Sequence, residues 1–116
     1  MPARTDAKAK VLADPLCCTP LTKSPLSAVE AEDLAPVFAA LGDPVRLRLL
    51  SIVAAEGEAC SCNLEAPLGK SQPTVSHHTR VLAEAGLIVG EKQGKWTWWK
   101  VVPERLGTVR HVLGGS

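Results

Sequence analysis

Apolar residues recur every three or four positions over most of the chain from residue 27 onward, which is typical of amphipathic helices. A first helix should begin at Ser27, because Ser27 and Glu30 fit a capping box in which each side chain accepts a backbone N–H. Pro36 lies too deep for a first turn, so we expect a kink or a break there. The apolar face of this helix would consist of Val29, Leu34, Val37, Phe38 and Leu41.

Three further helices follow in the pattern: over residues 44–55, around Leu64, and over residues 71–85. Asp43 followed by Pro44 predicts a helix start, since aspartate is a favoured N-cap and proline suits the first helical position. Ser71 would cap the last of the three, with Val75 and Leu82 facing inward.

The pattern becomes strand-like near the C-terminus. Residues 87–91 and 96–102 are rich in β-branched and aromatic side chains, and Gly94 between them allows a tight turn, which predicts a hairpin. A last short helix should open at Pro103. This order of elements predicts a mainly α fold with a small β-hairpin, namely a winged helix-turn-helix that presents one helix to a DNA major groove.

The first 26 residues differ from the rest, since they contain four prolines and no helical periodicity. We therefore divide the chain into an arm over residues 1–26, which carries the adjacent Cys17 and Cys18, and a DNA-binding and dimerisation domain over residues 27–116. No stretch is apolar for the roughly 18–20 residues that span a bilayer, and the polar N-terminus lacks the apolar core of a secretory signal. We expect a cytoplasmic protein with no membrane partner, whose thiols stay reduced.

Charge is distributed unevenly on a chain whose net charge is only +1. Residues 70–100 hold five Lys or Arg against two Glu, whereas residues 27–43 hold four acidic residues and no basic one. The basic half is a modest indication of a phosphate-binding face.

Four stretches in this order resemble the ArsR/SmtB family of metal-responsive repressors. They are LGDPVRLRLL at 41–50, CSCNL at 60–64, SQPTVSHH at 71–78, and VLAEAGLI at 81–88 leading into QGKW at 93–96. The resemblance implies a winged-helix homodimer that binds pseudo-palindromic double-stranded operator DNA and leaves it when an ion binds. Thr79 departs from the pattern, because the family has an apolar residue there, and we expect it to weaken the local packing.

The helix from Ser71 and the hairpin tip carry the side chains suited to DNA. Amide, guanidinium and hydroxyl groups can pair with base edges or phosphates, and lysines suit the backbone. The predicted contacts are Gln72, Thr74, Ser76, His77, Arg80, Lys92 and Lys95. His78, at the family's usual histidine position, is either structural or exposed to DNA, and the three tryptophans of residues 96–99 are expected to be structural.

Four cysteines in two close pairs point to a soft ion, because thiolates select Cu(I), Zn, Cd, Pb and arsenite-like species. The resemblance implies that Cys60 and Cys62 form the soft-ion site, and that Cys17 and Cys18 of the arm add ligands from the same or the other protomer. Arsenite or antimonite is the first choice of inducer; Cd, Pb or Zn would need a fourth ligand. Since residues i and i+2 of a helix point about 200° apart, both sulfurs can reach one ion only where the helix is unwound or absent. We therefore expect ion binding to distort this segment and so signal to the DNA-reading helix.

Two other classes remain open at this point. A redox-responsive repressor of the same fold would use the cysteine pairs to form disulfides. A metal carrier would bind ions without binding DNA. We expect no enzyme and no small-molecule substrate, because the two adjacent histidines lie on the presumed DNA face and a 116-residue chain leaves little room for a pocket.

Overall fold

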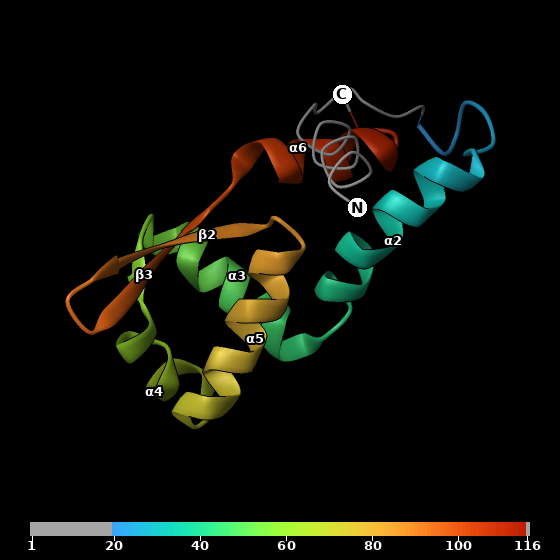
Figure 1. Ribbon diagram of the computed structural model, residues 1–116. Coiled ribbons are helices and arrows are strands. Elements are labelled where there is room, and N and C mark those ends of the chain that lie inside the picture. The colour runs from blue at the N-terminus through green and yellow to red at the C-terminus, as the bar shows by residue number, and fades with distance from the viewer. Residues whose placement is uncertain (1–19, 116) are drawn as a thin grey trace. The chain divides into compact units, whose positions relative to one another are not determined.

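The computed structural model describes residues 20–115 (Figure 1). In chain order its elements are α2 (Ala28–Leu41), α3 (Pro44–Glu56), β1 (Ala59–Cys60), the 3₁₀ turn η1 (Ser61–Asn63), α4 (Glu65–Leu68), α5 (Gln72–Glu84), β2 (Ile88–Gln93), β3 (Trp96–Val101) and α6 (Pro103–Val112). The predicted winged helix-turn-helix is confirmed, with one addition. The antiparallel sheet has three strands in the order β1-β3-β2, and the two-residue strand β1 was not predicted.

Residues 37–102 form one compact unit. Within it, α3 and α5 pack beside the hairpin of β2 and β3 (Figure 1). Its core is made of fully buried aliphatic side chains. They are Leu49 and Val53 of α3, Val75 and Leu82 of α5, Leu64 just before α4, and Leu87 just before β2. Val75 and Leu82 face inward as predicted, since positions seven apart share one side of a helix. This core holds α5 against the sheet and leaves its other side in solvent.

Local capping sets the helix starts where they were predicted. At α2, Ser27 N donates to Glu30 Oε1 (2.9 Å) and Glu30 N donates to Ser27 Oγ (3.1 Å), which completes the capping box. At α3, Asp43 Oδ2 accepts from the N–H groups of Val45 (2.9 Å) and Arg46 (3.1 Å). These two bonds hold the pKa of the Asp43 carboxyl below its ordinary value, the bond from Arg46 contributing most.

Helix α2 differs from the expectation at two places. The helix continues through Pro36 without a break. Val29, placed on the apolar face by its spacing, is 64% exposed, whereas Leu34 and Val37 are buried.

The flanking segments, residues 20–36 and 103–115, belong to a second compact unit. In it Leu21 N donates to Val112 O (2.8 Å), which ties the chain before α2 to the end of α6. The buried residues of α6 are Thr108, Val109 and Val112, and the predicted apolar Leu113 is 57% exposed. Across the described residues, no helix has the length and apolar character needed to cross a membrane.

Candidate DNA-binding face and cysteine pair

Helix α5 has one buried and one open side. Val75, Thr79 and Leu82 are buried, whereas the predicted DNA contacts Ser76 and Arg80 are exposed. We expected Thr79 to weaken the local packing, and this expectation is wrong. Thr79 is only 3% exposed, and its hydroxyl donates to Ser76 O (3.0 Å). The buried hydroxyl therefore has its hydrogen-bond partner within the helix, and the packing on this side of α5 is intact.

The first turn of α5 is organised differently from the prediction. Ser71 occupies the N-cap position, but its side chain makes no capping hydrogen bond to the backbone. Its Oγ instead lies 3.1 Å from Oγ1 of Thr74. The hydroxyl of Thr74, a predicted DNA contact, is therefore already paired in this structure.

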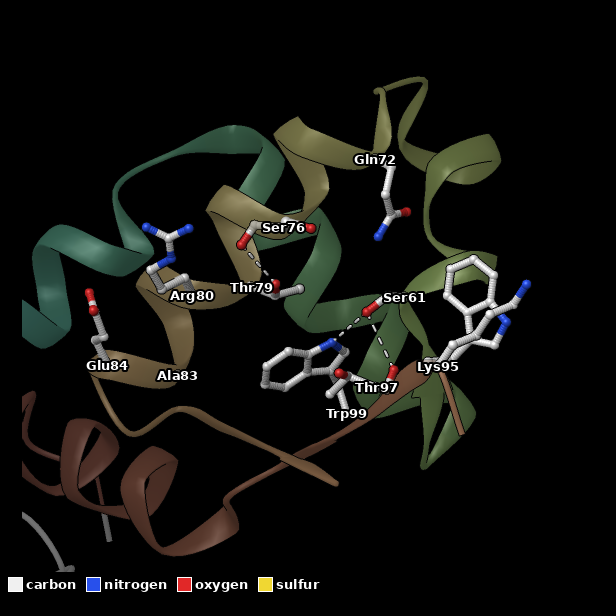
Figure 2. A pocket seen from close by; sticks show the side chains of 11 residues that line it. Ser61, Gln72, Ser76, Thr79, Arg80, Ala83, Glu84, Lys95, Thr97 and Trp99 are labelled. Atoms are coloured by element: carbon white, nitrogen blue, oxygen red, sulfur yellow. Dashed lines mark hydrogen bonds between the residues drawn. The ribbon is translucent and has the colours of Figure 1, made fainter. Parts of the chain in front are cut away.

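A groove of about 590 Å³ separates α5 from β3 (Figure 2). Gln72, Ser76 and Arg80 from α5 and Lys95 from the hairpin turn line it, so the structure brings four of the seven predicted DNA contacts together. Arg80 lies at one end of the groove, next to Glu84, and Gln72 and Lys95 lie toward the other. The remaining three, Thr74, His77 and Lys92, do not line this groove.

Gln72 points into the groove, and its Oε1 is buried without a hydrogen-bond partner. Sequence reasoning placed this amide at a base edge, whereas the structure turns it between the helix and the wing. The side chain therefore gains from any donor that enters the groove.

The β2–β3 hairpin is the wing of this fold, and the two lysines near its tip, Lys92 and Lys95, lie in different surroundings. Gly94 has φ = 67°, a conformation that favours glycine, and it starts the two-residue turn between β2 and β3. Lys95 follows it, with Nζ 5.5 Å from the ring centroid of Trp96. Lys92 is exposed on β2, outside the turn itself. Both lysines are exposed, so either ammonium group can approach a phosphate.

His78 is hydrogen-bonded to another residue of the same compact unit, Arg46, which favours the structural role for this histidine. Its Nδ1 lies 3.2 Å from Nη1 of Arg46, and the Nε–H of Arg46 donates to Ala40 O (2.7 Å). Partial burial lowers the pKa of His78, and the positive charge of Arg46 lowers it further, against the opposing effect of the Asp43 carboxylate. His77 is exposed, with its ring edge-on to that of His78.

Cys60 and Cys62 come together at the end of β1. Their sulfur atoms form a disulfide, with the Cα atoms 5.2 Å apart, and Cys62 N donates to Cys60 Sγ (3.3 Å). Neither residue lies in an α-helix, because α4 begins only at Glu65. The two sulfurs can therefore meet without unwinding an α-helix, with Cys62 in the 3₁₀ turn η1 and Cys60 just before it. Cys60 is 1% exposed and Cys62 is half-buried, so Cys62 is the more accessible of the two.

The pair alone does not make a complete ion site. Among residues 20–115, no three or more His, Cys, Asp or Glu side chains are grouped so that they could hold a metal ion. Cys17 and Cys18, the predicted additional ligands, lie outside the described residues.

Ser61 and Thr97 were missed by the sequence reasoning. Ser61, between the cysteines, accepts a hydrogen bond from Trp99 Nε1 (2.9 Å) and donates to Thr97 O (3.3 Å). Both partners belong to β3, and all three residues line the groove (Figure 2). The only available signal was the alternation of the tryptophans, which places Trp99 on the strand face opposite to Trp96 and Trp98; Trp99 is half-buried and lines the groove.

The fold and this face define a class: the chain is a winged helix-turn-helix DNA-binding transcriptional regulator. Residues 43–89 match the family described as "Bacterial regulatory protein, arsR family". An uncharacterized HTH-type transcriptional regulator of Methanocaldococcus jannaschii is 40% identical over 75 residues, which are 65% of this chain and 84% of the relative.

Two further proteins extend the comparison. The arsenic resistance transcriptional regulator ArsR1 of Pseudomonas putida is 40% identical over 68 residues, which are 59% of this chain and 53% of the length of that protein. The crystal structure of the AntR antimony-specific transcriptional repressor superimposes with a TM-score of 0.63 at 27% identity, covering 75% of this chain and 79% of that chain. The chain belongs to the ArsR family of transcriptional regulators.

Proposed function

We propose that the chain is a repressor that binds operator DNA as a homodimer in the cytoplasm and is released when arsenite or antimonite binds its cysteine thiolates. The convergence of the Cys60 and Cys62 sulfurs, one residue from the groove lined by Ser61 and α5, is the observation that carries the proposal. A DNA face and a soft-ion site this close together give an ion a direct route to affect DNA binding.

DNA binding is proposed for the exposed side of α5 and the hairpin tip. Arg80 and Lys95 supply two positive charges, and Gln72 and Ser76 supply groups that can donate or accept hydrogen bonds. Thr74, His77 and Lys92 stay in the proposed contact set, since all three belong to the same helix and hairpin. A homodimer would present two such faces to the two halves of an operator.

Inducer binding is proposed at Cys60 and Cys62 together with Cys17 or Cys18. Arsenite, As(OH)₃, would exchange its hydroxyls for thiolates: each thiol forms one S–As bond, one As–O bond breaks, and the thiol proton leaves with the hydroxide as water. Two exchanges use Cys60 and Cys62, and the third requires a sulfur from the arm of the same or the partner protomer. The arsenic and antimony named in two of the similar proteins support this choice. Cd, Pb or Zn remains the alternative, with a fourth thiolate.

The disulfide between Cys60 and Cys62 supports a second candidate, a redox-responsive repressor. In that case peroxide would take two electrons from the two thiols, and one S–S bond and two water molecules would form. The same two sulfurs would then report oxidation instead of an ion.

Operator binding by the protein reduced with a phosphine tests the proposal, using its own upstream DNA. Arsenite, antimonite, Cd, Pb and Zn are titrated in turn, with Cys60→Ser, Cys62→Ser and Cys18→Ser variants beside the wild type. Release by arsenite that is lost in each variant supports a shared thiolate site. Release by peroxide alone, with no effect of any ion, would replace the ion proposal with the redox candidate.

A further inference from the structure

Ser61 connects the cysteine pair to the wing. Its side chain is 8% exposed, and its hydroxyl is hydrogen-bonded on both sides, to Trp99 Nε1 at 2.9 Å and to Thr97 O at 3.3 Å. These partners lie 38 and 36 residues away in the chain. A buried hydroxyl with both bonds made holds its neighbours in one arrangement.

The backbone on either side of Ser61 is attached as well. Ala59 pairs with Trp99 and Cys60 pairs with Trp98 in the sheet, so residues 59–61 join residues 97–99 at consecutive positions. On the other side, Cys62 N donates to Cys60 Sγ. The position of the Cys60 sulfur is therefore coupled to the backbone that carries Ser61.

Any ligand shared by the two sulfurs constrains this single intervening residue. Two free thiols in the reduced protein have no bond that fixes their separation, whereas two thiolates bound to one centre at about 2.3 Å each cannot lie more than about 4.6 Å apart. This restriction must be taken up in the torsions of residues 60–62, at whose centre Ser61 lies.

The indole ring of Trp99 is poorly placed to absorb such a movement. A Cβ added at Gly90 of β2 would lie 2.7 Å from the Trp99 ring, so the ring packs directly against the neighbouring strand. Trp99 also lines the groove that holds Gln72 and Arg80 (Figure 2). A shift at Ser61 would therefore reach both strands of the wing and one wall of the groove.

We infer that Ser61 is a positioning residue that transmits the state of Cys60 and Cys62 to the DNA groove through its hydrogen bonds to Trp99 and Thr97. The inference rests on the proposed function and adds the route by which inducer binding lowers DNA affinity. It assigns no contact with the inducer to Ser61.

The experiment uses Ser61→Ala, which removes both hydrogen bonds of the hydroxyl, and Trp99→Phe, which removes only the bond from the indole. Operator Kd is measured with and without saturating arsenite in the reduced protein, and arsenite binding is measured separately by intact-mass stoichiometry. The ratio of the two Kd values is the coupling, which is typically 5- to 150-fold in allosteric proteins. Both variants are expected to bind arsenite with wild-type stoichiometry and to lose most of this ratio, and the double variant is expected to lose no more than either single one.

Two matched variants keep the experiment decisive. Trp98→Phe makes the same ring change at the adjacent position of β3 and is expected to keep the wild-type ratio. Ser61→Thr retains a hydroxyl at residue 61 and is expected to retain coupling even if Ser61→Ala folds poorly. Wild-type protein that arsenite does not release would contradict the proposed function. Normal release of Ser61→Ala or Trp99→Phe, or loss of coupling in Ser61→Thr with arsenite still bound, would overturn the inference alone.

Discussion

The guanidinium of Arg46 donates a hydrogen bond to Nδ1 of His78 across 3.2 Å, which joins α3 to α5. Because arginine can only donate, Nδ1 of His78 must be the acceptor and the imidazole is neutral, with its proton on Nε2. The lowered pKa of His78, caused first by burial and then by the Arg46 charge, agrees with a neutral imidazole. The second histidine of the motif therefore anchors α5, while His77 remains exposed.

This pair predicts a stability loss in mild acid. A histidine whose pKa is lowered in the folded state binds protons more readily when unfolded, so its contribution is complete above the unfolded pKa of about 6.5 and falls as pH drops below it. The groups that act on His78 are Asp43, Arg46, His77 and Lys70. Urea unfolding at pH 7.5 and 5.5 should show a smaller free energy of unfolding at the lower pH. His78→Gln should reduce this difference, whereas His77→Gln, which removes an exposed histidine that is a lesser cause of the lowered pKa than burial and Arg46, should preserve most of it.

Lys95 at the wing tip should contribute to DNA affinity without contributing to sequence choice. Lys95→Ala is expected to weaken operator and non-operator DNA by a similar factor, and to reduce the slope of log K against log salt by about 1, since one phosphate contact is lost. Fluorescence anisotropy at several salt concentrations measures both quantities. Lys100→Ala removes the same charge from a lysine paired with Glu58 outside the groove, and should leave the slope unchanged. An equal drop in both variants would mean that only net charge matters.

Gly90 should tolerate no side chain. A Cβ there would lie 2.7 Å from the Trp99 ring and 2.8 Å from Thr97 Cγ2, so one strand or the ring must move. Gly90→Ala is expected to lower the free energy of unfolding by about 1–3 kcal/mol, as overpacking does, and to change tryptophan fluorescence. Val89→Ala, at a neighbouring position that is 56% exposed, should change stability by less than about 0.5 kcal/mol. Equal stabilities of the two variants would show that the ring yields freely.

Cys62 should react before Cys60 in the reduced protein. Cys62 is half-buried and Cys60 is 1% exposed, and an alkylating reagent needs access to the thiolate. After reduction with a phosphine, timed iodoacetamide labelling and peptide mass spectrometry should find modified Cys62 first. The two should react alike in denaturant, and faster labelling of Cys60 in the native protein would contradict this order.

The amino-acid sequence alone determined the parts of this protein that depend on neighbouring residues. The Ser27–Glu30 box and the Asp43 cap form within three residues, and Gly94 makes its turn locally, so each could be predicted from a short stretch. The candidate DNA contacts came from local reasoning about α5 and the hairpin together with the family resemblance, and they stay a prediction.

The tertiary structure decided what depends on residues far apart in the chain. Strand β1 is two residues long and exists only because Cys60 pairs with Trp98, and no local pattern could indicate so short a strand. Ser61 is a small polar residue like many others until the fold brings Trp99 to within 2.9 Å of it. Capping and turn preferences act through bonds between neighbours, whereas strand pairing and the Ser61–Trp99 bond require a packed core to bring distant segments together. For that reason the helices and the β2–β3 hairpin could be predicted from the sequence, but strand β1 and the hydrogen bond from Trp99 to Ser61 could not.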